Sequence, residues 1–291
     1  MTDVLEIAGD GFRLGGEPWE PDGPFFAVLG DPVAHSLSPA MHNAALRERE
    51  IDAVYLPLRI QAGQLRRLKE AEFARDLVGF NVTAPHKEAV AALCDGRTDQ
   101  ARVLAAVNTV KVEDGRWLGH NTDSGGLLAV LAQVWPSEDR PERVVVLGAG
   151  GSGRAAIDAV LRWGVPRLEV RNRSADGQRR VRRWLEERGT ETEIRVDGLT
   201  AGSEGIPDRG TLWICCLAGG VSARPYLPVA AGASPAVLLD VRYGDQLPDE
   251  EPPLGFACQD GRPMLLMQGG LAFAWWNGPP VPWDAMRRAL D

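Results

Sequence analysis

The feature that most constrains this chain is a glycine-rich turn between an apolar run and an amphipathic helix. The run Val144–Leu147 predicts a buried strand, and residues 152–163 predict the helix. Between them, a GxGxxG spacing is formed by Gly148, Ala149, Gly150, Gly151, Ser152 and Gly153. In this context the spacing is typical of a dinucleotide-binding βαβ unit. The first glycine allows the tight turn, the second lets the backbone approach a pyrophosphate, and the third packs helix against strand.

The tip of the following strand indicates which dinucleotide is bound. A carboxylate there binds the ribose 2′-hydroxyl of NAD, whereas an arginine accepts the 2′-phosphate of NADP. Here the predicted strand 168–171 is followed by Asn172, Arg173 and Ser174, with no carboxylate at the tip. We therefore predict NADP(H), with Arg173 at the 2′-phosphate, and NAD(H) is the alternative.

The residues before this unit alternate between strand-like and helix-like segments. The expected strands are 25–29, 53–58 and 77–83, and the expected helices are 39–50, 61–73 and 85–94. Such alternation predicts an α/β fold with a mostly parallel sheet.

Two shorter strands, 107–112 and 116–120, are expected to form a hairpin. Between them lies Asp114-Gly115, a strong two-residue turn signal. With that turn, Glu113 pairs with Arg116. The same register brings Asn108 close to Asp123, which predicts that the two residues belong to one site.

We predict two domains with a cleft between them. Residues 1–24, rich in glycine, proline and acidic side chains, are expected to be an irregular extension. Residues 25–135 form the expected α/β substrate domain, and residues 136–267 form a Rossmann dinucleotide-binding domain. The helical tail 268–291 is expected to pack back on the first domain.

Composition and charge argue against several classes of function. The net charge of −8 disfavours nucleic acid as a partner. The longest apolar run, Met264–Trp276, contains Gln268 and is too short to span a bilayer. The acidic residues 1–10 lack the features of a signal peptide. The cysteines show neither metal-ligand spacing nor a disulfide framework. We expect a cytoplasmic protein, a monomer or a homodimer, with a small-molecule substrate, no bound metal and no membrane partner.

Lys87 violates a local rule. The segment from Asn81 to Lys87 predicts a strand end, a turn and the first turn of a helix, with Pro85 at the first helical position. A cation in that turn is disfavoured by about 0.3–1 kcal/mol, because it faces the positive end of the helix dipole. Such a residue is a functional candidate. The alternative is a solvated lysine whose stem lies along the surface.

Three other candidates, Ser36, Ser38 and Asp123, precede predicted helices, and for two of them helix capping is an alternative explanation. Ser36 and Ser38 point to the same side if their loop is extended, so they can bind one carboxylate or polyol. Ser38, however, precedes Pro39 and also suits a helix N-cap. Asp123 has the same capping alternative.

Polar residues inside apolar segments supply the remaining candidates. Asn81 and Thr83 share one face of their predicted strand. Gln268 interrupts an apolar run, and a buried amide needs hydrogen-bond partners that a ligand can supply. These residues therefore join the list for a substrate site.

Taken together, these segments resemble the shikimate dehydrogenase family. The shared motifs are, in chain order, Ser36-Leu37-Ser38-Pro39 with Met41-His42-Asn43, then Asn81-Val82-Thr83-x-Pro85-x-Lys87, Ala106-Val107-Asn108-Thr109, Gly119-His120-Asn121-Thr122-Asp123 and Met264-Leu265-x-x-Gln268. The resemblance extends from about residue 25 to residue 278. It implies an enzyme that reduces 3-dehydroshikimate to shikimate with NADPH, on the route to chorismate and the aromatic amino acids.

The resemblance also implies roles for individual residues. Ser36 and Ser38 would hold the substrate carboxylate. Lys87 and Asp123 would flank the reacting oxygen at C3, with Lys87 delivering the proton. An ammonium there stabilises the negative charge that reduction places on oxygen. The other substrate-binding candidates are Asn81, Thr83, Asn108, Tyr243 and Gln268, and Leu217 is a further cofactor-binding candidate.

The second half of the chain departs from the family pattern. Residues 215–220 stand where the family usually has Asn-Ala-Thr-x-x-Gly, and residues 244–246 replace a usual Asn-Pro. Ser124 replaces a common glycine, and Gly177 replaces an arginine. Two alternatives therefore stay open. One is a quinate/shikimate or related cyclitol dehydrogenase that uses NAD or NADP, and the other is a non-catalytic paralogue that binds a metabolite or cofactor.

Overall fold

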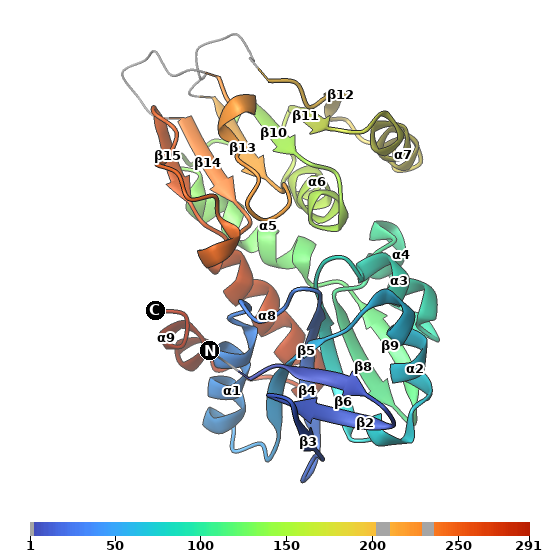
Figure 1. Cartoon of the computed structure of the whole chain (residues 1–291). Helices are drawn as coiled ribbons and strands as arrows, with labels where there is room; N and C mark the ends of the chain where they lie inside the picture. The colour runs from blue at the N-terminus through green and yellow to red at the C-terminus, as the bar shows by residue number, and fades with distance from the viewer. Residues whose placement is uncertain (1–2, 202–209, 229–235) are drawn as a thin grey trace. The chain divides into compact units, whose positions relative to one another are not determined.

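The computed structural model describes residues 3–201, 210–228 and 236–291, and the chain divides into two compact units. The first unit is Met1–Thr122 with Leu265–Asp291, and the second is Asp123–Met264 (Figure 1). Both are α/β units, as the alternation of the sequence predicts.

The first unit is built on a mixed sheet with the strand order β3-β2-β1-β5-β4-β6-β8-β9-β7. Its strands are β1 (Leu5–Ala8), β2 (Gly11–Leu14), β3 (Glu17–Trp19), β4 (Phe25–Gly30), β5 (Val54–Arg59), β6 (Leu77–Val82), β7 (Gly96–Arg97), β8 (Thr109–Glu113) and β9 (Arg116–His120). The central strands β5, β4 and β6 run parallel, and β8 pairs antiparallel with β6. Parallel pairing places the loops that follow β4 and β6 at the same edge of the sheet.

The expectation of an irregular extension at residues 1–24 is wrong for this unit. β1, β2 and β3 form an antiparallel meander, and β1 pairs in parallel with β5 (Figure 1, dark blue). Leu5 and Ile7 are buried on one face of β1, and the Phe12 ring meets the Phe25 ring edge to face. Each strand has only three or four residues between turns. Such short strands show too little alternation of apolar and polar residues to predict a strand in a segment rich in glycine and proline.

Helices cover this sheet in short pieces. They are α1 (Ser38–Glu48), α2 (Leu65–Glu70), α3 (Lys87–Leu93), α4 (Asp99–Leu104), α8 (Arg262–Asn277) and α9 (Trp283–Arg288), with the 3-10 helices η1 (Ala62–Gln64) and η2 (Glu72–Ala74). The single helix expected at 61–73 is therefore η1, α2 and η2 in succession. α8 begins before the expected residue 268, and in its last turn Trp276 donates a hydrogen bond to the Val110 carbonyl at 2.9 Å.

The second unit is a parallel sheet with the strand order β12-β11-β10-β13-β14-β15. Its elements are β10 (Arg143–Leu147), β11 (Arg167–Asn172), β12 (Glu193–Gly198), β13 (Thr211–Cys215), β14 (Ala236–Asp240), β15 (Phe256–Gln259), α5 (Asp123–Val134), α6 (Gly151–Trp163), α7 (Ala175–Glu186), η3 (Arg224–Tyr226) and η4 (Gly244–Gln246). In chain order this is the 3-2-1-4-5-6 arrangement of the Rossmann fold. The predicted Rossmann unit is confirmed.

The units meet in the sequence at residue 123, earlier than the expected boundary at residue 136. Leu127 and Leu131 of α5 lie in one buried cluster with Ile157 and Val160 of α6. α5 is apolar over most of its surface, so its sequence does not indicate which sheet it covers. Packing against α6 assigns it to the second unit.

A buried carboxylate holds α5 to α6. Asp158 is about 1% exposed, accepts a hydrogen bond from the Ser124 hydroxyl and pairs with Arg188. A buried charge needs such partners, because burial without them is costly. Ser124 therefore has a structural role in this chain.

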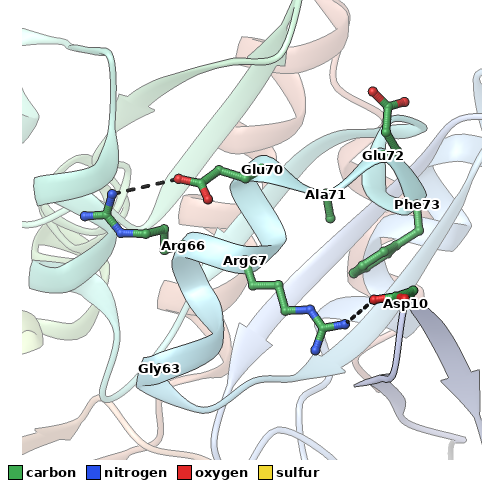
Figure 2. A pocket seen from close by; sticks show the side chains of 8 residues that line it. All are labelled: Asp10, Gly63, Arg66, Arg67, Glu70, Ala71, Glu72 and Phe73. Atoms are coloured by element: carbon green, nitrogen blue, oxygen red, sulfur yellow. Dashed lines mark hydrogen bonds and ion pairs between the residues drawn. The ribbon is translucent and has the colours of Figure 1, made fainter.

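A surface pocket of about 540 Å³ lies beside α2 in the first unit. Figure 2 shows Arg67 directed at Asp10, on the turn between β1 and β2, and Arg66 directed at Glu70. Arg67 also donates to the Gly9 carbonyl, so these contacts attach the hairpin to α2. Among the described residues that line this pocket, none is a candidate from the sequence. Likewise, no described helix combines the length and apolar character needed to cross a membrane.

Burial of His42 makes the stability of the first unit sensitive to acid. The imidazole, on α1, stacks on the Tyr55 ring with 4.4 Å between centroids. Removal from water disfavours the charged form and lowers the pKa of His42 from 6.5 to about 3. As the pH falls below 6.5, the unfolded chain takes up a proton that the folded chain does not, so folding stability decreases.

We expect the free energy of unfolding to fall by roughly 2 kcal/mol between neutral pH and about pH 5 from His42 alone. His42→Leu, which does not titrate, should lose this part of the pH dependence, as measured by urea unfolding at a series of pH values. Met41→Leu, at the neighbouring buried residue of α1, removes no titratable group and is the control, so it should keep the wild-type pH dependence. An unchanged pH dependence in His42→Leu would contradict this explanation.

Candidate active site

Lys87 is the first residue of α3, so the helix begins two residues later than Pro85, where the sequence predicts it. A turn precedes it, closed by the hydrogen bond from His86 N to the Thr83 carbonyl at 3.0 Å. The His86 ring is buried and its Nε2 donates to the Ile60 carbonyl at 2.7 Å. The Lys87 carbonyl accepts from Val107 N at 3.0 Å. These contacts place half-buried Lys87 beside the segment that leads to Asn108.

The predicted hairpin register is confirmed and positions Asn108. Glu113 pairs with Arg116, and Asn108 N donates to the His120 carbonyl at 3.1 Å. The Asn108 amide then fixes Thr122: its Oδ1 accepts from Thr122 N at 2.8 Å, and its Nδ2 donates to Thr122 Oγ1 at 3.0 Å. The next residue is Asp123, which is 5% exposed and begins α5. Asn108 therefore holds the residue that precedes Asp123.

Gln268 reaches the same amide from the other end of the chain. It lies on α8 and is 9% exposed. Its Oε1 accepts from Asn108 Nδ2 at 3.3 Å, and its Nε2 donates to the Leu265 carbonyl at 3.0 Å. This hydrogen bond joins two residues that are 160 positions apart in the sequence. Gln268 was a candidate because it is a polar residue inside an apolar run.

Asn81 is placed behind this amide by three hydrogen bonds to protein groups. Its Oδ1 accepts from the Tyr55 hydroxyl at 2.7 Å. Its Nδ2 donates to the Asn108 carbonyl at 3.2 Å and to Thr109 Oγ1 at 3.0 Å. The geometry supports a role in holding Asn108 in place. Tyr55, Thr109 and Thr122 were not candidates from the sequence, although Thr109 and Thr122 stood inside recognised motifs.

The loops after β4 and β6 carry the hydroxyl candidates. Ser38 is the first residue of α1, the cap position is Leu37, and the Leu37 side chain makes no capping hydrogen bond. The capping alternative for Ser38 is therefore not realised. Ser36 Oγ accepts from Ser38 N at 3.3 Å, which keeps the two serines together. Thr83 is half-buried, and a Cβ at Gly30 would lie 2.5 Å from its methyl group. Gly30, which the sequence did not single out, leaves room for Thr83.

In the second unit the glycine-rich turn fits a dinucleotide. Gly148 has φ +94°, and a Cβ there would lie 2.8 Å from the Cys216 carbonyl oxygen. A Cβ at Gly153 would overlap the Gly148 carbonyl. The fold itself requires these two glycines. Gly150 differs, because its φ of −72° suits any residue and a Cβ there would meet no described atom within 4 Å. That open space is where the βαβ motif brings the backbone to a pyrophosphate.

Of the three candidate residues at the tip of β11, two have side chains that hydrogen-bond to backbone groups of the protein. Asn172 Oδ1 accepts from Ala149 N at 3.1 Å, and so it supports the glycine-rich turn. A Cβ at residue 177 would overlap the Asn172 amide, which gives Gly177 a structural reason. Ser174 Oγ caps α7 by accepting from Gly177 N at 3.1 Å. Arg173, between them, is exposed, as a role at a 2′-phosphate requires.

The two remaining candidates lie in loops at the ends of neighbouring strands. Leu217 follows β13, is half-buried and packs against a buried cluster that contains Cys215. Tyr243 precedes η4 and is also half-buried. Both loops leave the edge of the sheet at which Rossmann folds bind their ligands.

Comparison with known proteins shows which family this chain belongs to. The model of the shikimate dehydrogenase substrate binding domain matches residues 28–110. A protein of Magnetococcus marinus named shikimate dehydrogenase (NADP(+)) is 32% identical over 275 residues, covering 91% of this chain and 94% of the relative. A protein of Rhodospirillum rubrum with the same name is 37% identical and covers 90% and 95%.

Solved structures agree with these relatives. Shikimate 5-dehydrogenase from Thermus thermophilus, in complex with NADP(H) and shikimate, superposes with a TM-score of 0.68 at 29% identity, covering 92% of this chain and 98% of the other. Ligand-free 5-ketofructose reductase of a Gluconobacter strain superposes with a TM-score of 0.73 at 27% identity and the same coverage. On the strength of the full-length relatives above 30% identity, the chain belongs to the shikimate dehydrogenase family.

Proposed function

We propose that this protein reduces 3-dehydroshikimate to shikimate with NADPH, with Lys87 as the proton donor and Asp123 as its partner. The observation that supports this most strongly is the hydrogen-bonded cluster around Asn108. It gathers Gln268 of α8 and Thr122, and it lies beside the segment that binds the backbone of Lys87. A cluster of buried amides and hydroxyls next to a lysine suits a substrate with several hydroxyl groups and a ketone.

Lys87 and Asp123 carry the proton chemistry of the proposal. Reduction of a ketone places negative charge on its oxygen, and an ammonium beside that oxygen stabilises the charge and supplies the proton. Asp123 orients the ammonium and shares its proton. NADPH, when bound, supplies the hydride.

The remaining residues bind and orient. Ser36 and Ser38 hold the substrate carboxylate, while Thr83, Asn108, Gln268 and Tyr243 contact its hydroxyls. Asn81, whose amide is engaged with Tyr55, Asn108 and Thr109, acts through Asn108. In the second unit the turn from Gly148 to Gly153 holds the pyrophosphate, with Leu217 beside the nicotinamide and Arg173 at the 2′-phosphate.

Ser38→Ala should weaken substrate binding without a comparable loss of kcat. A hydrogen bond to a charged group contributes about 1.5–3 kcal/mol, so we expect KM for shikimate to rise roughly tenfold to a hundredfold. KM for NADP⁺ should stay within twofold. Steady-state kinetics with each substrate varied in turn measures both values, and Ser137→Ala, in the second unit, is the control. An unchanged KM for shikimate would remove Ser38 from the carboxylate site.

A second candidate is the reduction of a related polyol ketone without a carboxylate. The structural neighbour that reduces 5-ketofructose favours it, because that substrate has no carboxyl group. Steady-state assays separate the candidates. Shikimate and quinate are each oxidised with NADP⁺ or NAD⁺, and 5-ketofructose is reduced with NADPH or NADH. The proposed function requires the highest kcat/KM with shikimate and NADP⁺, and no turnover of shikimate with either cofactor would exclude it.

A further inference from the structure

Arg242 is a buried arginine in the second unit that the proposed function does not use. It follows β14 and is 3% exposed. Its guanidinium binds both carboxylate oxygens of Asp240, with Nε to Oδ1 at 2.8 Å and Nη2 to Oδ2 at 2.6 Å. Such a bidentate pair fixes the plane of the guanidinium and directs its remaining N–H groups.

Those remaining groups point to the loop that follows β13. Nη1 donates to the carbonyls of Ala218 at 2.8 Å and Val221 at 2.7 Å. Nη2 also lies 3.3 Å from Cys215 Sγ. Burial raises the pKa of the Cys215 thiol to about 12, so this sulfur is a neutral acceptor. A single side chain thus connects the end of β13, the middle of the loop and its far end.

The loop lies at the dinucleotide edge of the sheet. Cys216 N donates to the Leu147 carbonyl at 2.8 Å, and the Cys216 carbonyl is the atom that a Cβ at Gly148 would meet. The order of the strands reverses between β10 and β13, and ligands of doubly wound sheets bind at that switch point. The loop therefore borders the glycine-rich turn on the side where the cofactor binds.

Besides its contacts with Arg242 and the bond from Cys216 N, the loop has two backbone hydrogen bonds, from Val221 N to the Ala218 carbonyl at 3.2 Å and from Gly220 N to the Gln246 carbonyl at 2.9 Å. Residues 218–220 are exposed and consist of one alanine and two glycines. A flexible loop that must be ordered on binding reduces affinity, whereas a preorganised loop does not.

We propose that Arg242 is a positioning residue that preorganises the loop 216–221 as one wall of the dinucleotide site. The inference rests on the proposed function only in taking this edge as the NADP(H) site.

The test compares binding and kinetics in three variants. Arg242→Met removes the donors but leaves Asp240 buried and unpaired, so it is paired with the double variant Asp240→Asn/Arg242→Met, which removes both charges. Arg242→Lys keeps a charge that can reach only part of the network. For each protein we would measure the Kd for NADP⁺ by calorimetry, KM and kcat for both substrates, and hydrogen exchange of the loop amides.

We expect the double variant to melt close to the wild type and to bind NADP⁺ about tenfold or more weakly. KM for shikimate should stay within twofold, and loop amides should exchange faster. Arg242→Lys should recover part of the affinity. A folded double variant with wild-type Kd and loop exchange would overturn the proposal.

Failure of the proposed function has a different signature. Wild-type protein that binds NADP⁺ but does not oxidise shikimate overturns the function and leaves the comparison of Kd values to decide on Arg242. Wild-type protein that binds neither NADP⁺ nor NAD⁺ overturns both proposals, because the loop would then border no dinucleotide site.

Discussion

Lys87→Met is expected to lower kcat for shikimate oxidation by about a thousandfold, with Kd values for shikimate and NADP⁺ within a few-fold of the wild type. A positioned proton donor contributes roughly 10² to 10⁴ in rate, and charge stabilisation of the reacting oxygen is lost with it. Methionine keeps most of the length of the side chain, so the start of α3 and the bond from Val107 N to the residue 87 carbonyl should persist.

Lys111→Met is the matched control for this substitution. Lys111 lies on β8 of the same sheet and pairs with Glu113 at the surface, so its loss should leave kcat unchanged. Asp123→Asn should reproduce much of the loss in Lys87→Met if the two residues act together, and the double variant should be little worse than either single one. Turnover in Lys87→Met within tenfold of the wild type would remove Lys87 from the chemistry.

Gly150→Ala and Gly153→Ala are expected to separate cofactor binding from folding. Gly150 has ordinary backbone angles and open space beyond its Cα, so alanine should leave the melting temperature nearly unchanged. The added methyl group occupies the place where a pyrophosphate approaches, and we expect NADP⁺ affinity to fall roughly tenfold to a hundredfold.

Gly153→Ala should affect the protein even without a ligand. The new methyl group would overlap the Gly148 carbonyl, and overpacking of this kind costs about 1–3 kcal/mol. Thermal unfolding with and without NADP⁺, together with calorimetric binding, distinguishes the two variants. A Gly150→Ala protein that binds NADP⁺ as tightly as the wild type would show that the turn does not hold the pyrophosphate.

Short-range patterns predicted the features whose cause is also short-range. The strand–turn–helix around Gly148 and the turn at Asp114-Gly115 depend on backbone angles that few residues adopt, and the register from Glu113 and Arg116 follows from that turn. The same register correctly brought Asn108 to the neighbour of Asp123.

Features that depend on which surface an element covers were not predictable in this way. The strands of residues 5–19 are too short for a clear period, and α5 carries an apolar surface that suits either sheet. Capping patterns also gave wrong helix starts. Ser38 suits a cap position, but the cap position of α1 is Leu37, and Pro85 suits a first helical position, but α3 begins at Lys87.

By itself, the sequence determined the α/β class and the Rossmann unit and supplied the candidates Ser38, Lys87, Asp123 and Gln268, because these depend on residue types at fixed spacing. Only the tertiary structure decided how those residues are supported. Asn81 turns its amide to Tyr55, and Arg242 reaches back to a loop more than twenty residues away. Hydrogen bonds between distant segments depend on how strands pair and helices pack, and no local spacing encodes them.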